Sequence, residues 1–186
     1  MDRSYRSLAI CTHDPRYVGF AGSEPSTETA QLCLEAACVL AEQGRYDVGL
    51  VDADPDAVPL QIQLKLAPTL RPEATWLIAP RLWLVPRQSW FSASRGQRIP
   101  EHSLTRLREL TTDFDFAVLR CPSALWPTTR IGRACDGLVL VLTANKTRRL
   151  AAVQIKDQLQ KAGVALLGTV LQERRLPVPE GLYRRL

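Results

Sequence analysis

The loop at residues 25–30, with the sequence PSTETA, lies where a phosphate-binding loop would lie in a strand, loop and helix unit. A β-rich run ends at Gly22 before the loop, and apolar residues at helical spacing follow it up to Gly44. Phosphate-binding loops hold phosphate oxygens with glycine N–H groups and a lysine side chain. This loop contains neither residue type, and the first lysine of the chain is Lys65. The stretch therefore has the layout of a phosphate site without the residues that bind phosphate.

Glu28 opposes a phosphate ligand further, because it places a negative charge in the loop. Two like unit charges about 4 Å apart repel by about 4 kcal/mol at an effective dielectric of about 20. The alternative is an ordinary helix start, in which Ser26 or Thr27 is the N-cap and Glu28 is favourable near the positive end of the helix dipole.

Two aspartates and one arginine also follow apolar runs that are typical of buried strands. Asp52 and Asp54 follow the run 46–51, and Arg120 follows the run 116–119. Arginine is always protonated, and its guanidinium offers a fork of N–H groups that matches a carboxylate. On their own, the aspartates are expected to cap the turn after their strand.

The elements that position these residues alternate between strands and helices. After the first strand and helix, the pattern predicts strands at 46–51, 82–85, 116–119, 137–143 and 165–171, and helices at 103–111 and 146–162. In the last helix, Ala152, Ile155, Leu159 and Ala162 form one apolar stripe, and Gly163 ends it. Strands that are apolar on both faces suit a parallel sheet covered by helices on both sides. In such folds ligands bind at the carboxyl ends of the strands.

Composition favours one domain over residues 1–186, since 186 residues with 46% hydrophobic content suit a single core. The five cysteines form no C-x-x-C pair, and the two histidines lie far apart, so we expect no metal site. No secretory signal or membrane-spanning apolar run is visible, which favours the cytoplasm. The net charge of +5 comes from scattered basic residues, so we expect no nucleic acid and consider an acidic partner or anionic lipid instead.

Several motifs resemble, in order, those of the bacterial tyrosine kinases (BY-kinases) of polysaccharide export. After the strand, loop and helix come VDADP, FDF, CDGLVLVLTANKTRR and GTVLQERRLPVPEGLYRRL, so that the resemblance extends from about Tyr5 to the C-terminus. BY-kinases belong to the MinD/ParA group of P-loop ATPases. The resemblance implies a three-layer α/β/α fold with a mostly parallel central sheet.

The resemblance also implies that the first loop has lost its nucleotide chemistry. In the family pattern P-G-E-G-K-[ST]-T, Pro25 is kept, while Ser26 and Glu28 occupy the glycine positions. Thr29 occupies the lysine position, and Ala30 occupies the position of the hydroxyl that binds magnesium.

The other family motifs are kept in part. Asp52 and Asp54 match the aspartates that act around magnesium and the attacking group, whereas Arg120 stands where the family has a second magnesium carboxylate. From this resemblance we predict that Arg120 pairs with Asp52 or Asp54, with its guanidinium in place of the metal ion. The alternative is that Arg120 covers the mouth of the pocket. Gln172 stands where the family often has an asparagine that reads adenine. We therefore expect a relic pocket with no cofactor; ATP with magnesium is the alternative.

The ends of the chain carry the positions that in the family contact partners. Arg6 is the one arginine kept from the family pattern for ring assembly, and Tyr183 is a single tyrosine where the family has a cluster. The candidates for partner binding are Arg6, Arg174, Arg175, Tyr183, Arg184 and Arg185.

From the resemblance we expect a catalytically inactive subunit in exopolysaccharide synthesis and export, cytoplasmic and peripheral at the inner membrane. It would bind the cytoplasmic segment of a copolymerase or chain-length protein, or an active homologous ATPase; a homodimer is a further alternative. The alternative functions are an active ATPase or tyrosine autokinase with a non-standard phosphate loop, and a ParA-like positioning module acting on membrane or DNA.

Overall fold

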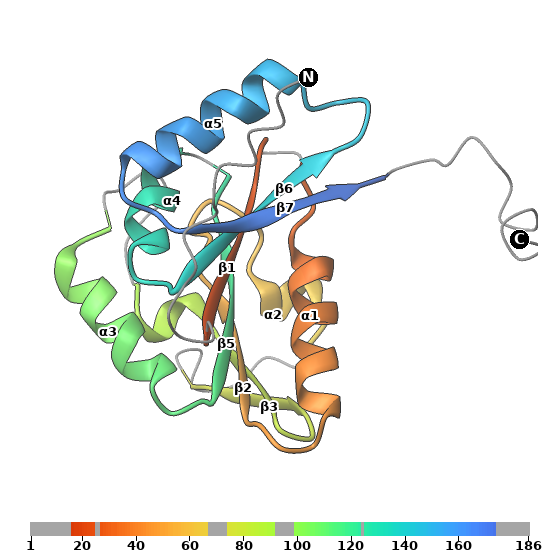
Figure 1. Cartoon of the computed structure of the whole chain (residues 1–186). Helices are drawn as coiled ribbons and strands as arrows, with labels where there is room; N and C mark the ends of the chain where they lie inside the picture. Colours follow the sequence, from red (N-terminus) through yellow and green to blue (C-terminus); the bar gives the residue numbers. More distant parts are fainter. Residues whose placement is uncertain (1–15, 25–26, 67–73, 92–98, 124, 174–186) are drawn as a thin grey trace, which may run out of the picture.

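The structure, a computed structural model, describes residues 16–24, 27–66, 74–91, 99–123 and 125–173. In these ranges seven strands form one sheet in the order β3-β4-β2-β5-β1-β6-β7 (Figure 1). All neighbouring strands are parallel except β3 and β4. The elements are β1 (Tyr17–Gly22), α1 (Ala30–Glu42), β2 (Val48–Asp52), α2 (Leu60–Gln63), β3 (Trp76–Ala79), β4 (Leu82–Val85), the 3-10 helix η1 (Arg87–Ser89), α3 (Glu101–Thr111), β5 (Phe116–Cys121), α4 (Leu125–Gly132), β6 (Gly137–Thr143), α5 (Arg149–Lys161) and β7 (Leu166–Gln172).

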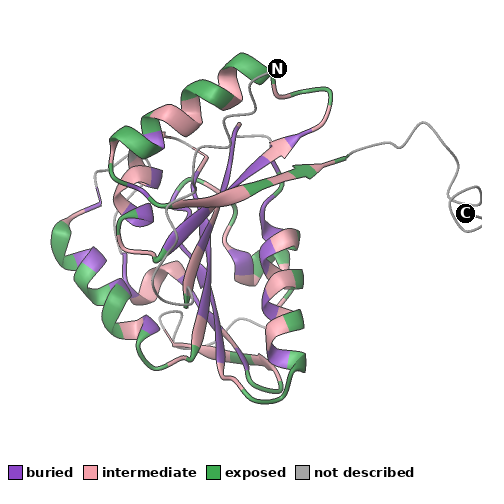
Figure 2. Cartoon of the chain, viewed as in Figure 1, coloured by how far each residue is buried: buried purple, intermediate pink, exposed green. Residues whose placement is uncertain are grey.

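Helices cover both faces of the sheet, so the predicted three-layer α/β/α class with a mostly parallel sheet is confirmed. Helices α1 and α2 pack on one face, and α3, α4 and α5 pack on the other (Figure 1). Two apolar clusters lie between these layers, one containing Cys33 and Leu60, and the other containing Leu107, Ile131 and Leu159. Figure 2 shows that burial is concentrated on the central strands and on the inner sides of the helices.

Helices α1 and α5 end where glycine permits a left-handed backbone. Gly44 follows α1 with φ of 69°, and Gly163 follows α5 with φ of 75°, as the sequence predicted. Helix α1 buries small residues at helical spacing, among them Ala30, Cys33 and Ala37, so that it can lie close to the sheet.

Five predicted elements differ from the structure at their ends. Helix α3 begins at Glu101 and not at 103, β5 ends at Cys121 and not at 119, and β7 spans Leu166–Gln172 and not 165–171. The other two differences, in α5 and β2, have a local cause. Helix α5 begins at Arg149 and not at 146, because Asn145 turns the chain with φ of 63° and the Thr147 hydroxyl accepts a hydrogen bond from the Thr143 N–H at 3.1 Å. Strand β2 begins at Val48 and not at 46, and the ring of Tyr46 instead packs edge-on against the ring of Phe116.

Four elements were not predicted: α2, β3, η1 and α4. Helix α2 is a single short turn, and β3 is the antiparallel edge strand that reaches β4 through a turn at Arg81, where φ is 59°. Helix α4 carries Pro127 in its first turn, which is compatible with a helix but conceals the helical pattern in the sequence. None of the helices in the described ranges combines the length and apolar character that crossing a bilayer requires.

Candidate functional site

The predicted site residues of the middle loops meet at the carboxyl edge of the sheet. Strands β2 and β5 are parallel neighbours, and their register places Asp52 directly beside Arg120. Asp52, Asp54 and Arg120 are all buried, although each carries an ionisable side chain. Buried charges require partners, so the contacts among these three residues determine what the edge can do.

Arg120 forms an ion pair with Asp52, as predicted. Its Nη1 lies 3.7 Å from Asp52 Oδ1, and the side chains are 6% and 0% exposed. The same Nη1 donates a hydrogen bond of 2.9 Å to the carbonyl oxygen of Val58. The alternative in which Arg120 lies at the mouth of an open pocket is therefore wrong, because the guanidinium is inside the protein.

The two aspartates also accept hydrogen bonds from backbone N–H groups, in agreement with the expectation that they cap the turn after their strand. Asp52 Oδ2 accepts a hydrogen bond from the N–H of Leu60, the first residue of α2, at 2.9 Å. Asp54 Oδ1 accepts from the N–H groups of Asp56 and Ala57 at 3.0 and 3.2 Å. Burial raises the pKa of both carboxyl groups, against the opposing effects of these N–H groups and of the Arg120 charge.

The ion pair is electrostatic and not hydrogen-bonded. Asp52 Oδ1 and Arg120 Nε are both buried, and neither has a hydrogen-bond partner among the described residues. A separation of 3.7 Å is too long for a hydrogen bond. The charge of the guanidinium is therefore the main compensation for this carboxylate oxygen, and the loss of either partner would leave an uncompensated buried charge.

The relic first loop leads directly into α1. Thr29 is the N-cap residue and is buried, although its side chain makes no capping hydrogen bond. Thr27 is therefore not the N-cap; its hydroxyl accepts a hydrogen bond from the Glu24 N–H at 3.3 Å. Ala30 is buried and Glu28 is exposed, while Pro25 and Ser26 lie outside the described residues. In this loop Thr29 and Ala30 supply neither a cationic side chain nor a magnesium-binding oxygen at their motif positions.

Two hydrogen bonds join the relic loop and the residue after β1 to distant parts of the same edge. Gln172, at the position of the adenine-reading residue, donates from Nε2 to the carbonyl oxygen of Glu28 at 3.1 Å. The hydroxyls of Ser23 and Thr147 are 2.9 Å apart. The structure thus places Gln172, at the relic base position, next to the relic phosphate loop. A hydrogen bond within the chain joins the two.

Three further residues of this edge were not predicted. Val58 supplies the carbonyl that binds Arg120, Trp90 donates from Nε1 to the carbonyl oxygen of Asp52 at 3.1 Å, and Arg87 donates from Nη1 to the carbonyl oxygens of Asp54 and Pro55. Arg87 follows β4, whose carboxyl end is beside that of β2. Arg87 could have been predicted from the rule that parallel strands end at one edge of the sheet. The backbone carbonyl acceptors could not, because every residue has a carbonyl group and the side-chain type does not mark those that accept.

The predicted partner-binding residues cannot be placed. Arg6, Arg174, Arg175, Tyr183, Arg184 and Arg185 lie outside the described residues.

No protein-family model matches the chain, and no curated protein matches it by sequence. Solved structures do match it. The VpsO kinase domain is 17% identical with a TM-score of 0.73, covering 90% of this chain and 89% of that one. The BceF tyrosine kinase domain is 23% identical with a TM-score of 0.62, covering 84% and 68%. The septum site-determining protein MinD from Pyrococcus horikoshii OT3, complexed with Mg-ADP, is 18% identical with a TM-score of 0.66, covering 91% and 76%.

At these identities the likeness establishes the fold. It agrees with the strand order, with the helix layers and with the resemblance that the motifs indicate. The chain has the fold that MinD/ParA-type P-loop ATPases share with bacterial tyrosine kinase domains.

Proposed function

We propose that the chain is a catalytically inactive relative of the BY-kinases, which acts as a binding or regulatory subunit in exopolysaccharide synthesis and export at the inner membrane. Support for the family comes from the shared fold and from the order of the motifs along the chain. Support for inactivity comes from the carboxyl edge of the sheet.

The observation that carries the proposal is the buried pair of Arg120 and Asp52. Magnesium binds through oxygen ligands, and here a guanidinium occupies the position of one family ligand and neutralises another. A magnesium ion beside Asp52 would lie next to a fixed positive charge, which opposes its binding. The residues present therefore do not fit Mg-ATP, and no phosphoryl transfer is assigned to this chain.

The relic loop supports the same conclusion. A phosphate needs donors that point at it, and Thr29 and Ala30 offer no cation at the motif positions, while Glu28 adds a negative charge. Gln172 is already bonded to the backbone of Glu28, so an adenine would have to compete for that amide.

The proposed partners are the cytoplasmic segment of a copolymerase or chain-length protein, or an active homologous ATPase. A protein that keeps the fold but not the chemistry can still present surfaces, and function resides in such sites and not in the fold. The basic residues at the two ends are the proposed contacts with an acidic or lipid-bound partner.

Titration with Mg-ATP and Mg-ADP tests inactivity. We expect no heat of binding by calorimetry and no thermal shift at millimolar nucleotide, with the Pyrococcus MinD as the positive control. A ligand at about 100 times its Kd stabilises a protein by about 2.7 kcal/mol, so even weak binding would be visible. A micromolar Kd would overturn the proposal in favour of an active ATPase or autokinase, the alternative that Asp52 and Asp54 favour.

Co-purification with the cytoplasmic segment of the copolymerase tests the partner. We expect a complex with the wild-type chain and its loss when Arg174, Arg175, Arg184 and Arg185 are changed to glutamate. A complex that is indifferent to these changes would remove the proposed role of the C-terminal arginines, and no complex at all would remove this partner.

A further inference from the structure

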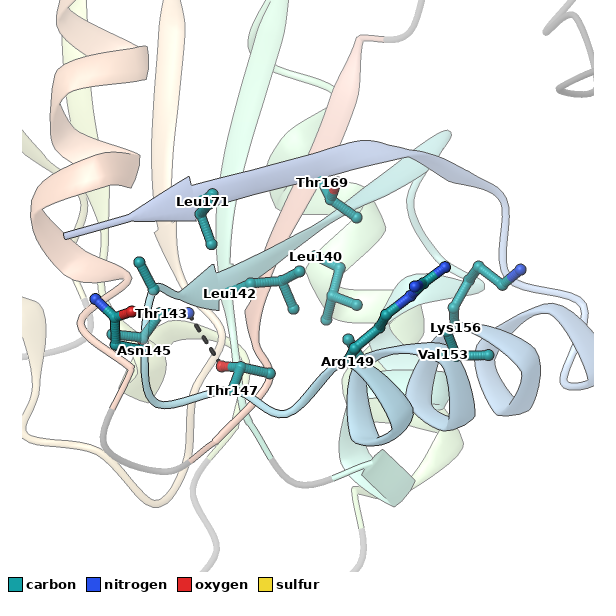
Figure 3. Close-up of a pocket in the computed structure, with 12 residues that line it drawn as sticks. Leu140, Leu142, Thr143, Asn145, Thr147, Arg149, Val153, Lys156, Thr169 and Leu171 are labelled. Atoms are coloured by element: carbon teal, nitrogen blue, oxygen red, sulfur yellow. Dashed lines mark hydrogen bonds between the residues drawn. The ribbon is translucent and has the colours of Figure 1, made fainter. Parts of the chain in front are cut away.

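A groove of about 510 Å³ lies on the opposite side of the sheet from α1, between α5 and the strands β6 and β7. Figure 3 shows Leu140, Leu142, Thr169 and Leu171 projecting from the two strands towards α5. The register of β6 and β7 places Leu140 beside Thr169 and Leu142 beside Leu171, so these four side chains share one face. Leu171 is 51% exposed. The groove therefore has an apolar floor that is buried at Leu140, partly exposed at Leu142 and half-exposed at Leu171.

The helical wall of the groove alternates positive charge and apolar surface. Arg149, Val153 and Lys156 line it at spacings of four and three residues, which places them on one side of α5. Figure 3 shows Arg149 and Lys156 extending from α5 towards β7. Arg149 has no acidic partner within the described ranges, and Lys156 is paired only with its neighbour Asp157 at 3.3 Å. The wall is thus positively charged and can accept carboxylates.

The solvent side of α1 carries the complementary pattern. Glu35, Val39 and Glu42 repeat the spacing of four and three residues, and Leu32 extends the row by three residues towards the start of the helix. Val39 is 60% exposed and is not part of the core of its own molecule. The acidic character reaches the adjacent Cys38, whose pKa is raised by partial burial and by the carboxylates of Glu42 and Glu35.

We propose that α1 of one copy of this chain docks on the α5 groove of a second copy. Glu35 and Glu42 would meet Arg149 and Lys156, and Val39 would meet Val153 and the apolar floor. The equal spacing of the two rows lets all three contacts form at once. Helices α1 and α5 cover opposite faces of the sheet (Figure 1), so the contact can form only between molecules.

This contact uses two different surfaces and is therefore heterologous. Repetition of such a contact gives a closed ring or an open chain and not a two-fold dimer. The inference stands apart from the proposed function, because it concerns neither the nucleotide edge nor the ends of the chain.

Two electrostatic effects oppose each other in this assembly: the attraction between the acidic row of α1 and the basic row of α5, and the repulsion between copies that carry the same net charge. The docking helices attract, while each copy carries a net charge of +5 and repels the next. Salt screens exposed pairs, so the association should be strongest near physiological ionic strength or below, and weaker at 0.5 M salt.

The test is sedimentation velocity over a concentration series from about 1 μM to about 200 μM, with paired charge reversals. The wild-type chain should associate as concentration rises. The variant Glu35→Lys/Glu42→Lys, with two basic rows, and the variant Arg149→Glu/Lys156→Glu, with two acidic rows, should each remain monomeric. An equimolar mixture of the two variants should associate again, because each contact in the mixture joins opposite charges.

Matched controls separate this contact from general charge effects. The variant Arg106→Glu/Arg108→Glu lowers the net charge as much as Arg149→Glu/Lys156→Glu does, but on the exposed side of α3, and it should associate at least as well as the wild type. Thermal melts of every variant establish that it is folded. A wild-type chain that stays monomeric over the whole series overturns the proposal. Association that survives both reversals, or a mixture that stays monomeric, overturns it equally.

Discussion

At the carboxyl ends of β2 and β5 the polar side chains are buried and bound to one another, whereas near the ends of β6 and β7 they surround an open groove. Arg120 and Asp52 belong to the first region, and Arg149 and Lys156 belong to the second. Both regions contain basic side chains next to apolar strands. The difference is that the first region satisfies its charges within one molecule, while the second leaves them available to another.

The comparison separates two uses of one fold. A buried pair contributes to specificity and to the position of a loop, and its removal affects folding. An exposed charge contributes little to folding but can select a partner. Changes in the first region should therefore act on stability, and changes in the second should act on association.

The largest expected effect on stability comes from Arg120→Met, which removes the guanidinium and leaves Asp52 buried without its partner. We expect a loss of about 3–5 kcal/mol in the free energy of unfolding, measured by urea denaturation. The double variant Arg120→Met/Asp52→Asn should recover part of this loss, because no unpaired charge remains. A single variant as stable as the wild type would show that the pair does not matter to the fold.

A pair of glycine substitutions compares an interior strand with the edge strand. A Cβ on Gly49, in β2, would lie 2.6 Å from the ring of Phe114, whereas a Cβ on Gly168, in β7, would meet nothing within 4 Å. Gly49→Ala should cost about 1–3 kcal/mol by overpacking, and Gly168→Ala should be neutral or stabilise by up to about 1 kcal/mol. Equal effects in thermal melts would contradict the difference in packing between the two regions.

The pH dependence of stability tests the buried state of Asp54. Its pKa lies above the ordinary 3.8, because burial disfavours the charged form. Between 3.8 and the raised value the folded state holds more protons than the unfolded state, so stability should fall as pH rises through this window. Asp54→Asn keeps the acceptor for the N–H groups of Asp56 and Ala57, and it should lose this contribution. An identical pH profile for the variant, from urea denaturation at pH 4 to 7, would exclude Asp54 as its source.

The smallest expected effect on stability comes from the groove. Leu171→Ser changes a half-exposed side chain, so we expect a change of less than about 0.5 kcal/mol in the free energy of unfolding. The same variant should weaken the concentration-dependent association, because it removes part of the apolar floor. A large loss of stability would show that the floor belongs to the core, and the two regions would then differ less than proposed.

The sequence predicted strands β4 and β6 best, because their residues are apolar and mostly buried. The bounds of β4 and β6 are as predicted. The missed elements are short or irregular: α2 has four residues, β3 pairs only at the edge, and Pro127 lies inside α4. These elements form because of contacts with residues that are distant in the sequence, and a local sequence pattern holds no information on such contacts.

The part of the site that could be predicted is the pairing of its buried charged side chains. The family resemblance singled out Arg120, and a buried arginine needs a carboxylate, so a pair with Asp52 or Asp54 was predicted; the choice of Asp52 was not. The hydrogen bonds to Val58 and from Trp90 could not be predicted, because carbonyl groups are the same in every residue. The apolar stripe of α5 was predicted through Ile155, Leu159 and Ala162, which pack on the core, but Ala152 lines the groove instead.

The strand order has a consequence for how the chain folds during synthesis. Strand β1 pairs only with β5 and β6, which begin about a hundred residues later. Until Phe116 and its successors leave the ribosome, β1 has apolar residues and two edges of backbone but no strand to bind. Pairings of such high sequence separation are slow to form, and unpaired edges favour aggregation. The central position of β1 among the described strands thus means that it is synthesised well before both of the strands that flank it and is paired late in folding.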